Sequence, residues 1–567
     1  MEDKSANALG GALYKFYTLI KADRKDFYSI YAYAIFSGLL QLSLPLGIQT
    51  IIGFVMAGVL SASMIVLIVL VVTGVFFSGL LQVKQMQVIE KIEQKLFLRY
   101  AFEFTDRLPR IDMQRVNSYY LPEMVNKFFD TMSLQKGISK LLLDIPAAFI
   151  QLIFGLILLS FYHPVFIAFG VSLFLLVILI LRFSSVKGME TNMLASDYKY
   201  KVAGWIEEIA RTIKTFKYSK GTSIHLKQTD TLTTGYLNAR TEHFKILQKQ
   251  YWSLIAFKVL ITAAMLIVGA LLLINQKLNI GQFVAAELVI IMVIAAVEKF
   301  IINLDKVYDV LTALEKLGKV TGSKTESEGS LILPDFKSGV ALKFDNVSFE
   351  YSAINPVLRN LSFKVEAGQH IAVMGDSGAG KSTILRLLTG AFKKFDGNIL
   401  IDEIPIGNYS LQSLRAHTGI LLSMQDIFKG SLLENITMGN EAVSLQEITT
   451  LAEITGLSEL TEQQKEGYDF ILDPAGQGLP KKFIQSILVM RALLGEHRLL
   501  LLEEPCQHFN KINTQKILRF LKNDTTATIV IATTDETVAA SCDKVLLLKN
   551  GIIYAQGPWH EVKNKIL

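Results

Sequence analysis

The chain has 567 residues, a length that predicts two or more domains. Hydrophobic residues make up 51% of it, which is high for a soluble enzyme. The net charge of +6 is consistent with the excess of Lys and Arg in the loops described below, and it requires no nucleic-acid partner. The start, MEDKS, is acidic and polar, so no cleavable signal peptide is expected.

The apolar residues are concentrated in the first half of the chain. No charged residue occurs in Phe27–Val83, which is long enough for two membrane spans of about 20 residues each. Ile145–Leu181 is also free of charge and is interrupted only at His163-Pro164, which predicts a helical hairpin. Val259–Gln276 and Leu278–Val297 predict a third pair. We therefore expect six spans in a lipid bilayer.

The connections between these spans differ in charge. Those near Ala57–Ser63, Ser160–Pro164 and Asn275–Asn279 contain one Lys and no Arg in total, whereas Lys84–Lys140 and Arg182–Lys258 are rich in both. Lys and Arg accumulate on the cytoplasmic side of a membrane. The short connections are therefore predicted to face outward, with both termini on the cytoplasmic side of the inner membrane.

The two long inner segments predict helices that continue beyond the bilayer. Val88–Leu96 is charged and periodic, as in a cytosolic helical extension. Short connections are expected at the tips of the extensions, at Leu121–Asp130 and Gly204–Ala210. These are predicted to dock on the downstream domain as coupling helices, and the alternative is amphipathic helices that lie on lipid headgroups.

Changes in composition define four parts of the chain. Residues 1–26 form an N-terminal cytosolic or elbow segment, too short for a peptidase-like domain that would cleave a leader. The membrane domain with its cytosolic extensions spans 27–320, and 321–335 is a polar linker with Gly and Ser. The strand-like Val340–Phe344 opens an α/β domain at 336–567. The predicted fold is thus an all-α membrane domain followed by a cytosolic α/β domain.

A phosphate-binding loop lies in the α/β domain. The sequence GDSGAGKST follows the apolar run His370–Met374 and precedes a helical pattern, which is the strand–turn–helix context that this motif requires. Glycines let backbone N–H groups surround phosphates, and the helix N-terminus favours anions. We expect Lys381 to neutralise the β- and γ-phosphates and Ser382 to hold Mg²⁺. The predicted nucleotide contacts in the loop are Gly375, Ser377, Gly378, Ala379, Gly380, Lys381, Ser382 and Thr383.

Two cysteines, Cys506 and Cys542, lie in the cytosolic half. A structural disulfide is not expected in the cytosol, and no CxxC motif or metal cluster is present in the sequence. They are predicted to be small hydrophobic residues in or near a core.

With these motifs in this order, the whole chain resembles a half-transporter of the ATP-binding-cassette exporter family, with the type I exporter fold. The resemblance implies ATP and Mg²⁺ as cofactors. It places the family's adenine-stacking aromatic residue at Tyr351, and at Gln425 the glutamine that senses Mg²⁺ and the attacking water. The segment from Ile280 onward, IGQFVA, is most similar to exporters of peptides and proteins, which implies type I secretion and a periplasmic adaptor as a possible partner.

The family's pair of carboxylates closes a hydrophobic strand, which corresponds here to Leu499–Leu502 followed by Glu503 and Glu504. Glu503 replaces the usual aspartate that holds Mg²⁺, and its longer side chain would reach the ion from a shifted position. Glu504 matches the general base. The alternative for both is a solvated strand end. The resemblance thus implies Ser382, Gln425 and Glu503 as metal ligands and Glu504, Gln425 and Thr533 as catalytic residues.

Thr533 departs from the family pattern. The final strand is expected at Thr528–Asp535, where Thr533 takes the place of the histidine that contacts the γ-phosphate. A hydroxyl is shorter and carries no proton that titrates near neutral pH. Loss of such a contact typically lowers the rate by about 10²–10³. Slow hydrolysis is therefore predicted at this chain's own site.

The signature motif is altered most. The family sequence LSGGQ corresponds to LPKKF at Leu479–Phe483, before the helix Ile484–Leu494, so lysine and phenylalanine are expected where glycine and glutamine contact the nucleotide. This predicts a degenerate site, and the alternative is that Lys481 or Lys482 contacts phosphate as a point charge. Asn510 replaces a family aspartate, and Pro474 lies near the place of a coupling glutamate.

These losses favour a heterodimer with a second half-transporter that carries competent residues, and a homodimer is the alternative. Two functions remain open: a subunit of an ATP-driven exporter, and an ATP-binding, nearly non-hydrolysing regulator or scaffold. The substrate is not indicated by the sequence. Glu287 in the last span either contacts substrate or extends to the nearby outer boundary.

Overall fold

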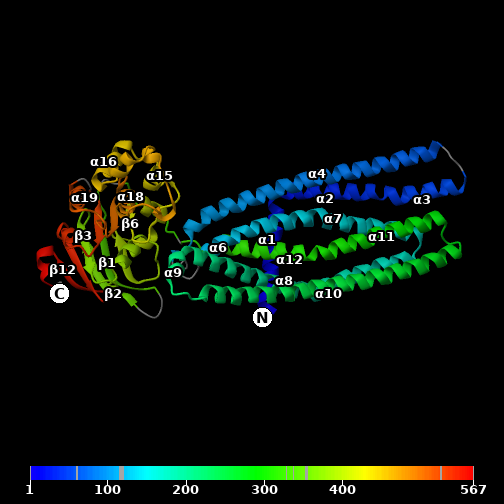
Figure 1. Ribbon diagram of the computed structural model, residues 1–567, viewed down its shortest axis with the longest axis horizontal. Helices are drawn as coiled ribbons and strands as arrows, with labels where there is room; N and C mark the ends of the chain where they lie inside the picture. Colours follow the sequence, from blue (N-terminus) through cyan, green and yellow to red (C-terminus); the bar gives the residue numbers. More distant parts are fainter. Residues whose placement is uncertain are drawn as a thin grey trace. The chain divides into compact units, whose positions relative to one another are not determined.

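A computed structural model describes the backbone of residues 2–58, 62–113, 121–326, 328–335, 338–351, 356–523 and 526–565. It divides into two compact units, one built from most of residues 2–325 and the other from most of residues 326–565. The first unit is helical and the second combines helices with β-sheets (Figure 1). This confirms the predicted fold class.

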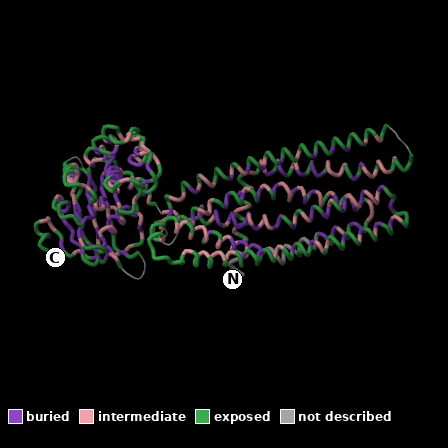
Figure 2. The backbone as a smooth tube through the Cα atoms, in the orientation of Figure 1, coloured by how far each residue is buried: buried purple, intermediate pink, exposed green. Residues whose placement is uncertain are grey.

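The described part of the helical unit is dominated by long helices. Its helices are α1 (Glu2–Ala22), α2 (Arg24–Gln41), α3 (Ser43–Met56), α4 (Ala62–Arg107), α6 (Leu121–Asn126), α7 (Asp130–Tyr162), α8 (Val165–Arg211), α9 (Ile213–Tyr218), α10 (Ile224–Ile274), α11 (Ile280–Ile302) and α12 (Leu304–Thr321). In Figure 2 most of their length is exposed or half-buried, as expected of helices whose apolar side chains face lipid.

Within the described residues, five helical stretches are long and apolar enough to cross a membrane: Arg24–Met56, Ala62–Arg110, Leu121–Tyr162, Ile224–Ile274 and Ile280–Thr321. The predicted fourth span falls on the 47-residue helix α8, part of whose side chains lie outside the described residues. The chain turns where the sequence predicts: α7 ends before His163, α8 begins after Pro164, and α10 ends one residue before Asn275.

Glycines allow close packing of α7 against the last span. A Cβ atom on Gly155 would lie 2.5 Å from Cγ2 of Val293 in α11, and one on Gly137 would collide with Val310 in α12. At the crossing of α7 with α11, which lies in the predicted spans, a small residue such as Gly155 lets the helix backbones approach closely, because lipid gives membrane helices no hydrophobic drive to associate. The position of α7 against α11 and α12 therefore depends on these two residues.

One of the two predicted tip connections is wrong. Gly204–Ala210 lies inside α8, which continues to Arg211, and a separate short helix, α9, follows. The segment stays helical because its end is stabilised by the ion pair of Arg211 with Glu208, and a single glycine costs too little to end a helix. Leu121–Asp130 does contain short elements, the helix α6 and the 3₁₀ turn Lys127–Phe129.

The α/β unit contains two main sheets. The first has the order β2-β1-β4-β5 and is antiparallel, and the second has the order β12-β11-β3-β10-β9-β6 and is parallel except for its edge pair β11–β12. Their strands are β1 (Leu342–Glu350), β2 (Pro356–Val365), β3 (His370–Gly375), β4 (Asp396–Ile401), β5 (Ile404–Pro405), β6 (Thr418–Leu421), β9 (Leu499–Glu503), β10 (Thr528–Ala532), β11 (Lys544–Lys549) and β12 (Ile552–Gly557). A small pair, β7 (Gly430–Ser431) and β8 (Ile471–Leu472), lies apart from both.

The strand at Thr528–Asp535 is therefore neither the last nor as long as predicted. It ends at Ala532, and β11 and β12 follow it in the chain. It lies in the interior of the sheet, between β3 and β9, which fits the complete burial of its five residues.

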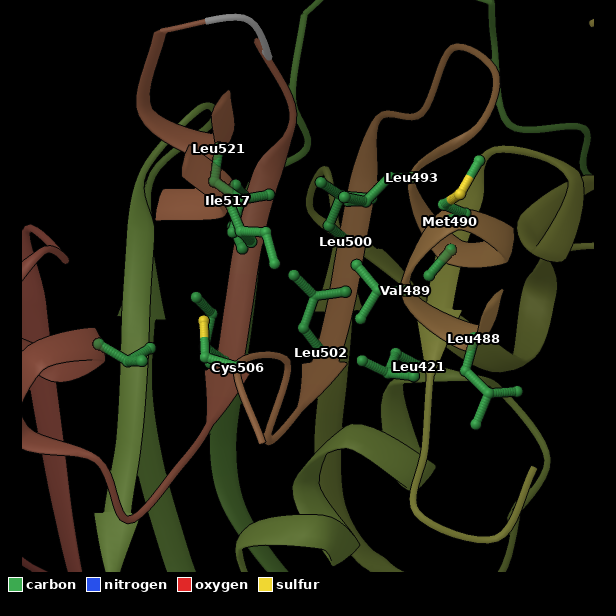
Figure 3. Packing of buried hydrophobic residues seen from close by; sticks show 14 of the residues in the cluster. Leu421, Leu488, Val489, Met490, Leu493, Leu500, Leu502, Cys506, Ile517 and Leu521 are labelled. Atoms are coloured by element: carbon green, nitrogen blue, oxygen red, sulfur yellow. The ribbon is translucent and has the colours of Figure 1, made fainter. Parts of the chain in front are cut away.

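Helices of this unit pack on the parallel sheet or on one another. They are α13 (Lys381–Leu388), α14 (Leu411–Ala416), α15 (Leu432–Thr437), α16 (Leu445–Thr455), α17 (Ser458–Gln463), α18 (Lys481–Leu493), α19 (Lys511–Asn523), α20 (Glu536–Ala540) and α21 (Trp559–Val562). Of these, α15 and α16 pack against α18 rather than against the sheet. Figure 3 shows Leu500 and Leu502 of β9 between Val489 of α18 and Ile517 of α19. This apolar core fixes β9, and with it the two glutamates at its end.

The parallel register places the functional residues at one edge of the sheet. Ala532 at the end of β10 pairs with Val373 of β3 and with Glu503 of β9, and Leu421 of β6 pairs with Leu502. Residues that follow these strands emerge side by side, at the carboxyl edge where α/β proteins bind ligands.

Arg498 ties the start of β9 to the segment that precedes β1. Its side chain is 6% exposed and donates to the backbone oxygens of Ser338, Pro334 and Gly339 and to a carboxylate oxygen of Asp402 at 3.0 Å. A buried charge with several partners leaves all of them unsatisfied when it is removed.

Arg498→Leu is therefore expected to lower the free energy of unfolding of the α/β unit by about 3 kcal/mol or more. The matched control is Arg359→Leu, because Arg359 is exposed on β2. Thermal unfolding of the full chain in detergent measures both. Equal midpoints for the two variants would contradict the structural role of Arg498.

Candidate functional site: a nucleotide-binding edge of the parallel sheet

The predicted phosphate-binding loop lies between β3 and α13. Gly375, Gly378 and Gly380 have φ values of 143°, 85° and 103°, a region that other residues rarely adopt. A Cβ atom on Gly380 would also lie 2.5 Å from Cδ2 of Leu358. The tight strand-to-helix turn therefore requires glycine, as the motif predicts. Ser377 is exposed in this turn, whereas Ala379 and Thr383 are buried beneath it.

Lys381 begins α13 and folds back over the loop. Its ammonium Nζ donates to the backbone oxygens of Gly375 at 2.6 Å and Asp376 at 3.0 Å. A positive charge held across the loop, together with the N-terminal end of α13, forms a site for a polyanion.

Ser382 and Glu503 meet directly. The Ser382 hydroxyl donates to Oε1 of Glu503 at 2.5 Å, and the backbone N–H of Ser423 donates to Oε2 at 2.9 Å. The glutamate thus reaches the loop hydroxyl although it replaces a shorter residue. A hydroxyl beside a carboxylate is the oxygen donor set that Mg²⁺ prefers, so these two residues fit the ion.

Gln425 forms its hydrogen bonds elsewhere and not with Ser382 or Glu503. Its amide Nε2 donates to the backbone oxygen of Ile420 at 3.1 Å, and its Oε1 accepts from the N–H of Leu422 at 3.3 Å. In this conformation the side chain stabilises its own turn after β6.

Glu504 is held by the residues that follow β10. Its Oε2 accepts from the hydroxyl of Thr533 at 3.0 Å, and its Oε1 accepts from both the N–H and the hydroxyl of Thr534, at 2.8 and 3.1 Å. We call this set of three hydrogen bonds the threonine clasp. Thr534 was not among the predicted site residues, although its place next to Thr533 is a signal once β9 and β10 are known to be neighbours.

The backbone of Glu504 is also unusual. Its φ of 45° lies in the left-handed region, which is uncommon for a residue other than glycine, and its N–H donates to the backbone oxygen of Ala532 at 2.8 Å. Gln485 of α18 donates to the Glu504 carbonyl oxygen at 3.1 Å. Strained backbone of this kind concentrates at functional sites because the surrounding contacts must hold it in place. Gln485 is a second residue that the sequence did not single out.

Tyr351 lies beside the loop. Its hydroxyl is 3.3 Å from the Thr383 hydroxyl and accepts from Nη1 of Arg386 at 3.2 Å, which ties it to α13. The edges of Phe349 and Phe392 hold the ring, with centroids 4.9 and 5.6 Å away, and 40% of the residue is exposed. A fixed, partly exposed ring next to a phosphate site can stack on a base.

The altered signature motif begins α18 at Lys481, three residues before the start of the predicted helix Ile484–Leu494. Phe483 belongs to the first turn of α18 and is buried in the apolar core cluster, so its ring is not presented to a nucleotide. Lys482 pairs with Glu459 at 2.5 Å and lies over the Phe483 ring. Pro480 immediately precedes the helix, where its ring is tolerated. Lys481 is exposed at the same end.

Two other predicted deviations have structural roles. The side chain of Asn510 accepts from the N–H of Asn513 at 2.8 Å and so caps the start of α19. Pro474 begins a 3₁₀ turn, Pro474–Gly476. The two cysteines, Cys506 and Cys542, are free and buried, as expected of core residues, and burial raises the pKa of each thiol to about 12.

Two family models match this chain. Residues 358–507, from β2 through the carboxylate pair, match the ABC transporter model, and residues 30–297 match the model of the ABC transporter transmembrane region. A membrane domain of this family joined to an ATP-binding domain of the same family defines the class, and the chain belongs to the ABC transporters.

Two curated relatives are similar to part of the chain. The chain is 31% identical over 261 residues to the uncharacterized ABC transporter ATP-binding protein YfiC of Bacillus subtilis, a match that covers 46% of this chain and 41% of that protein. It is 30% identical over 303 residues to the alpha-hemolysin translocation ATP-binding protein HlyB of Escherichia coli O157:H7, over 52% of this chain and 42% of the relative. The matches thus span about two fifths of the length of these curated relatives.

A solved structure covers nearly the whole chain. The structure of a bacterial Atm1-family ABC exporter with ATP bound aligns with 96% of this chain and 97% of its own, with a TM-score of 0.82 and 20% sequence identity. The chain therefore has the fold of an ABC exporter.

Lys381→Met is expected to weaken ATP binding by about 10- to 100-fold, since a charged hydrogen-bond donor to phosphate is lost. Lys394→Met is the matched control, because Lys394 is exposed downstream of α13. Equilibrium titration of the purified full chain with a fluorescent ATP analogue measures both. Unchanged ATP affinity in Lys381→Met would show that this loop does not bind the nucleotide.

The raised thiol pKa values predict unreactive cysteines. With a pKa of about 12, only about one part in 10⁴ of the Cys506 and Cys542 thiols is ionised at pH 8, and both are buried. Iodoacetamide at pH 8 is therefore expected to label neither in the folded chain and both after denaturation, as read by mass spectrometry. Rapid labelling of the folded protein would contradict their place in the core.

Proposed function

We propose that this chain is a subunit of an ATP-driven membrane exporter that binds ATP at a dimer interface and couples closure of its cytosolic halves to alternating access. The observation that carries the proposal is the meeting of Lys381, Ser382, Glu503 and Glu504 at one edge of the sheet. The fold of an ABC exporter and the membrane-region match support it.

Each residue has a role in this proposal. Tyr351 would stack on adenine, the loop N–H groups and Lys381 would bind the phosphates, and Ser382 with Glu503 would hold Mg²⁺. Mg²⁺ supplies charge neutralisation at the phosphates when it is bound. Glu504 would accept a proton from the attacking water.

We further propose that hydrolysis at this chain's own site is weak. The threonine clasp occupies both carboxylate oxygens of Glu504, so an incoming water must compete with three existing donors. The Thr533 hydroxyl has one proton to donate, and it is directed at Glu504 rather than left for a phosphate. Gln425 must also leave its own turn before it can reach Mg²⁺ or water.

The partner is proposed to be a second, different half-transporter. Phe483 is in the core, so a nucleotide bound by the partner would face chiefly the exposed Lys481 and the paired Lys482 of this chain. A lysine can contact phosphate only as a point charge, and it does not reproduce the close backbone approach of glycine. A homodimer would carry this deficit at both sites, which favours the heterodimer.

The membrane side of the proposal follows from charge and from relatives. An inner-membrane location with both termini in the cytoplasm rests on the uneven distribution of Lys and Arg between the loops. HlyB is named for the translocation of alpha-hemolysin, which favours a peptide or protein cargo here. A periplasmic adaptor is proposed from the resemblance of the segment from Ile280 onward to exporters of peptides and proteins. We propose that Leu121–Asp130, which contains α6 and the turn Lys127–Phe129, acts as a coupling helix, and the alternative is that it lies on lipid headgroups.

The threonine clasp also favours a second candidate: a subunit that binds ATP, hydrolyses almost none and regulates a membrane complex. ATPase assays of the chain alone and together with a candidate second half-transporter separate the two functions. An exporter subunit gives turnover in the mixture that Glu504→Gln lowers. ATP binding without turnover in either sample would contradict the exporter function.

The clasp itself yields a prediction. Thr534→Ala removes one of the three donors to Glu504. Because that hydrogen bond restrains the carboxylate, its loss is expected to raise ATP turnover by about two- to tenfold. Thr537→Ala, at an exposed position three residues further, is the control. A steady-state phosphate-release assay measures both. Lower turnover in Thr534→Ala would show that the clasp assists catalysis.

A further inference from the structure

A cavity of about 1070 Å³ lies at the end of the helical unit where α3 and α10 end and α11 begins (Figure 1). Its walls come from the last turns of α3 and from the turn that joins α10 to α11. The lining combines apolar side chains, such as Phe54 and Leu273, with amides, such as Gln49 and Gln276. Among the described residues that line the cavity, Lys277 alone is charged. The cavity is therefore amphipathic and has a single positive charge.

The cavity lies at a boundary of the predicted membrane layer. Lys277 separates the predicted spans Val259–Gln276 and Leu278–Val297. Ala57, which also lines the cavity, begins the predicted connection that follows α3. In the proposed orientation this is the outer boundary, where the hydrocarbon layer meets the lipid headgroups. An amphipathic cavity at this level can contact both the polar and the apolar part of a lipid.

Backbone hydrogen bonds fix the turn that contains Lys277. Its N–H donates to the carbonyl oxygen of Leu272 at 2.9 Å. Two residues later, Asn279 forms a capping box with Gln282 at the start of α11. The fold therefore sets the place of Lys277 at the cavity, and its side chain is exposed there.

No acidic residue balances this lysine on the outer side. The three predicted outer connections contain no Asp or Glu, and Lys277 is their only Lys or Arg. Glu287, the nearest acidic residue along the chain, is not among the described residues that line the cavity. Within the part of the chain that the structure describes, Lys277 has no carboxylate partner. A fixed cation without a counter-charge attracts an anion from its surroundings.

We propose that this cavity binds the headgroup of a phospholipid with net negative charge, which stays bound at the outer end and is not cargo. Lys277 contacts the phosphate as a point charge, and the amide of Gln276 donates to it. The apolar lining, which includes Phe54, contacts the upper part of the acyl chains. A zwitterionic lipid brings a cation for which the described lining has no carboxylate, so the anionic lipid is preferred.

The test of the charge is lipid binding to the full chain in detergent, measured by native mass spectrometry during titration with phosphatidylglycerol or phosphatidylcholine. The wild type is expected to bind phosphatidylglycerol more tightly. Lys277→Gln is expected to weaken the first binding event about three- to tenfold, whereas Lys277→Arg retains it. Lys84→Gln is the matched control, because Lys84 is exposed just after the charge-free run that ends at Val83 and does not line this cavity.

A second variant tests the cavity rather than the charge. Gly53 lines the cavity, and a Cβ atom there would meet nothing within 4 Å, so Gly53→Leu fills the space without a collision at Cβ. It is expected to weaken phosphatidylglycerol binding at least threefold. Gly79→Leu is the matched control, because Gly79 is equally open in α4 and lies outside this cavity. Phosphatidylglycerol is also expected to raise the thermal unfolding midpoint of the wild type more than that of Lys277→Gln.

Several results would overturn the inference. Equal phosphatidylglycerol affinity in the wild type and Lys277→Gln would mean that the lysine is only hydrated, and equal losses in Lys277→Gln and Lys84→Gln would mean a general attraction of basic side chains. An unchanged affinity in Gly53→Leu would place the lipid elsewhere. Displacement of the lipid by millimolar inorganic phosphate would assign Lys277 to a free anion. Fluorescent ATP binding on the same samples is independent of these outcomes, so a failure here leaves the proposed function unaffected.

Discussion

The structure of the nucleotide site depends on the register of three neighbouring parallel strands, β3, β10 and β9. Main-chain hydrogen bonds align Val373, Ala532 and Glu503 in one row, so that the phosphate loop, the Thr533-Thr534 pair and the two glutamates leave the sheet together. The strands themselves are completely apolar in their interiors and are covered by helices, which makes a slip of register costly. The phosphate loop and the two glutamates, more than a hundred residues apart in the sequence, thus lie together because of one buried sheet.

At that edge, two adjacent carboxylates receive different surroundings. Glu503 meets a loop hydroxyl and a backbone N–H, and it faces the phosphate site where an ion would be held. Glu504 has a left-handed backbone conformation and accepts hydrogen bonds from Thr533 and Thr534, which follow β10. One glutamate is arranged for binding and the other is restrained by hydrogen bonds. This difference in surroundings is the physical reason to treat ATP binding and ATP hydrolysis as separate properties of this chain.

Features that depend on local sequence were predictable, and those that depend on long-range packing were not. The glycine loop and its flanking strand and helix follow from the chain between His370 and Leu388, because a positive φ and a free helix end are local requirements. The role of Thr534 was not predictable, since it requires β10 to pair with β9. Burial of Phe483 depends on the core that packs against α18, and the continuity of Gly204–Ala210 within α8 depends on how far that helix extends.

In the membrane unit, too, the sequence does not predict features that depend on long-range packing. A charge-free sequence from Phe27 to Val83 predicts two spans, but it does not distinguish a glutamine that joins helices from one that faces a cavity. Gln85 is buried with a backbone partner and stabilises packing, whereas Gln82, one turn away on the same helix, is exposed at a cavity wall. Gln82 lies two residues before Lys84, where the charge-free run ends, so its amide reaches the membrane edge, where water satisfies it.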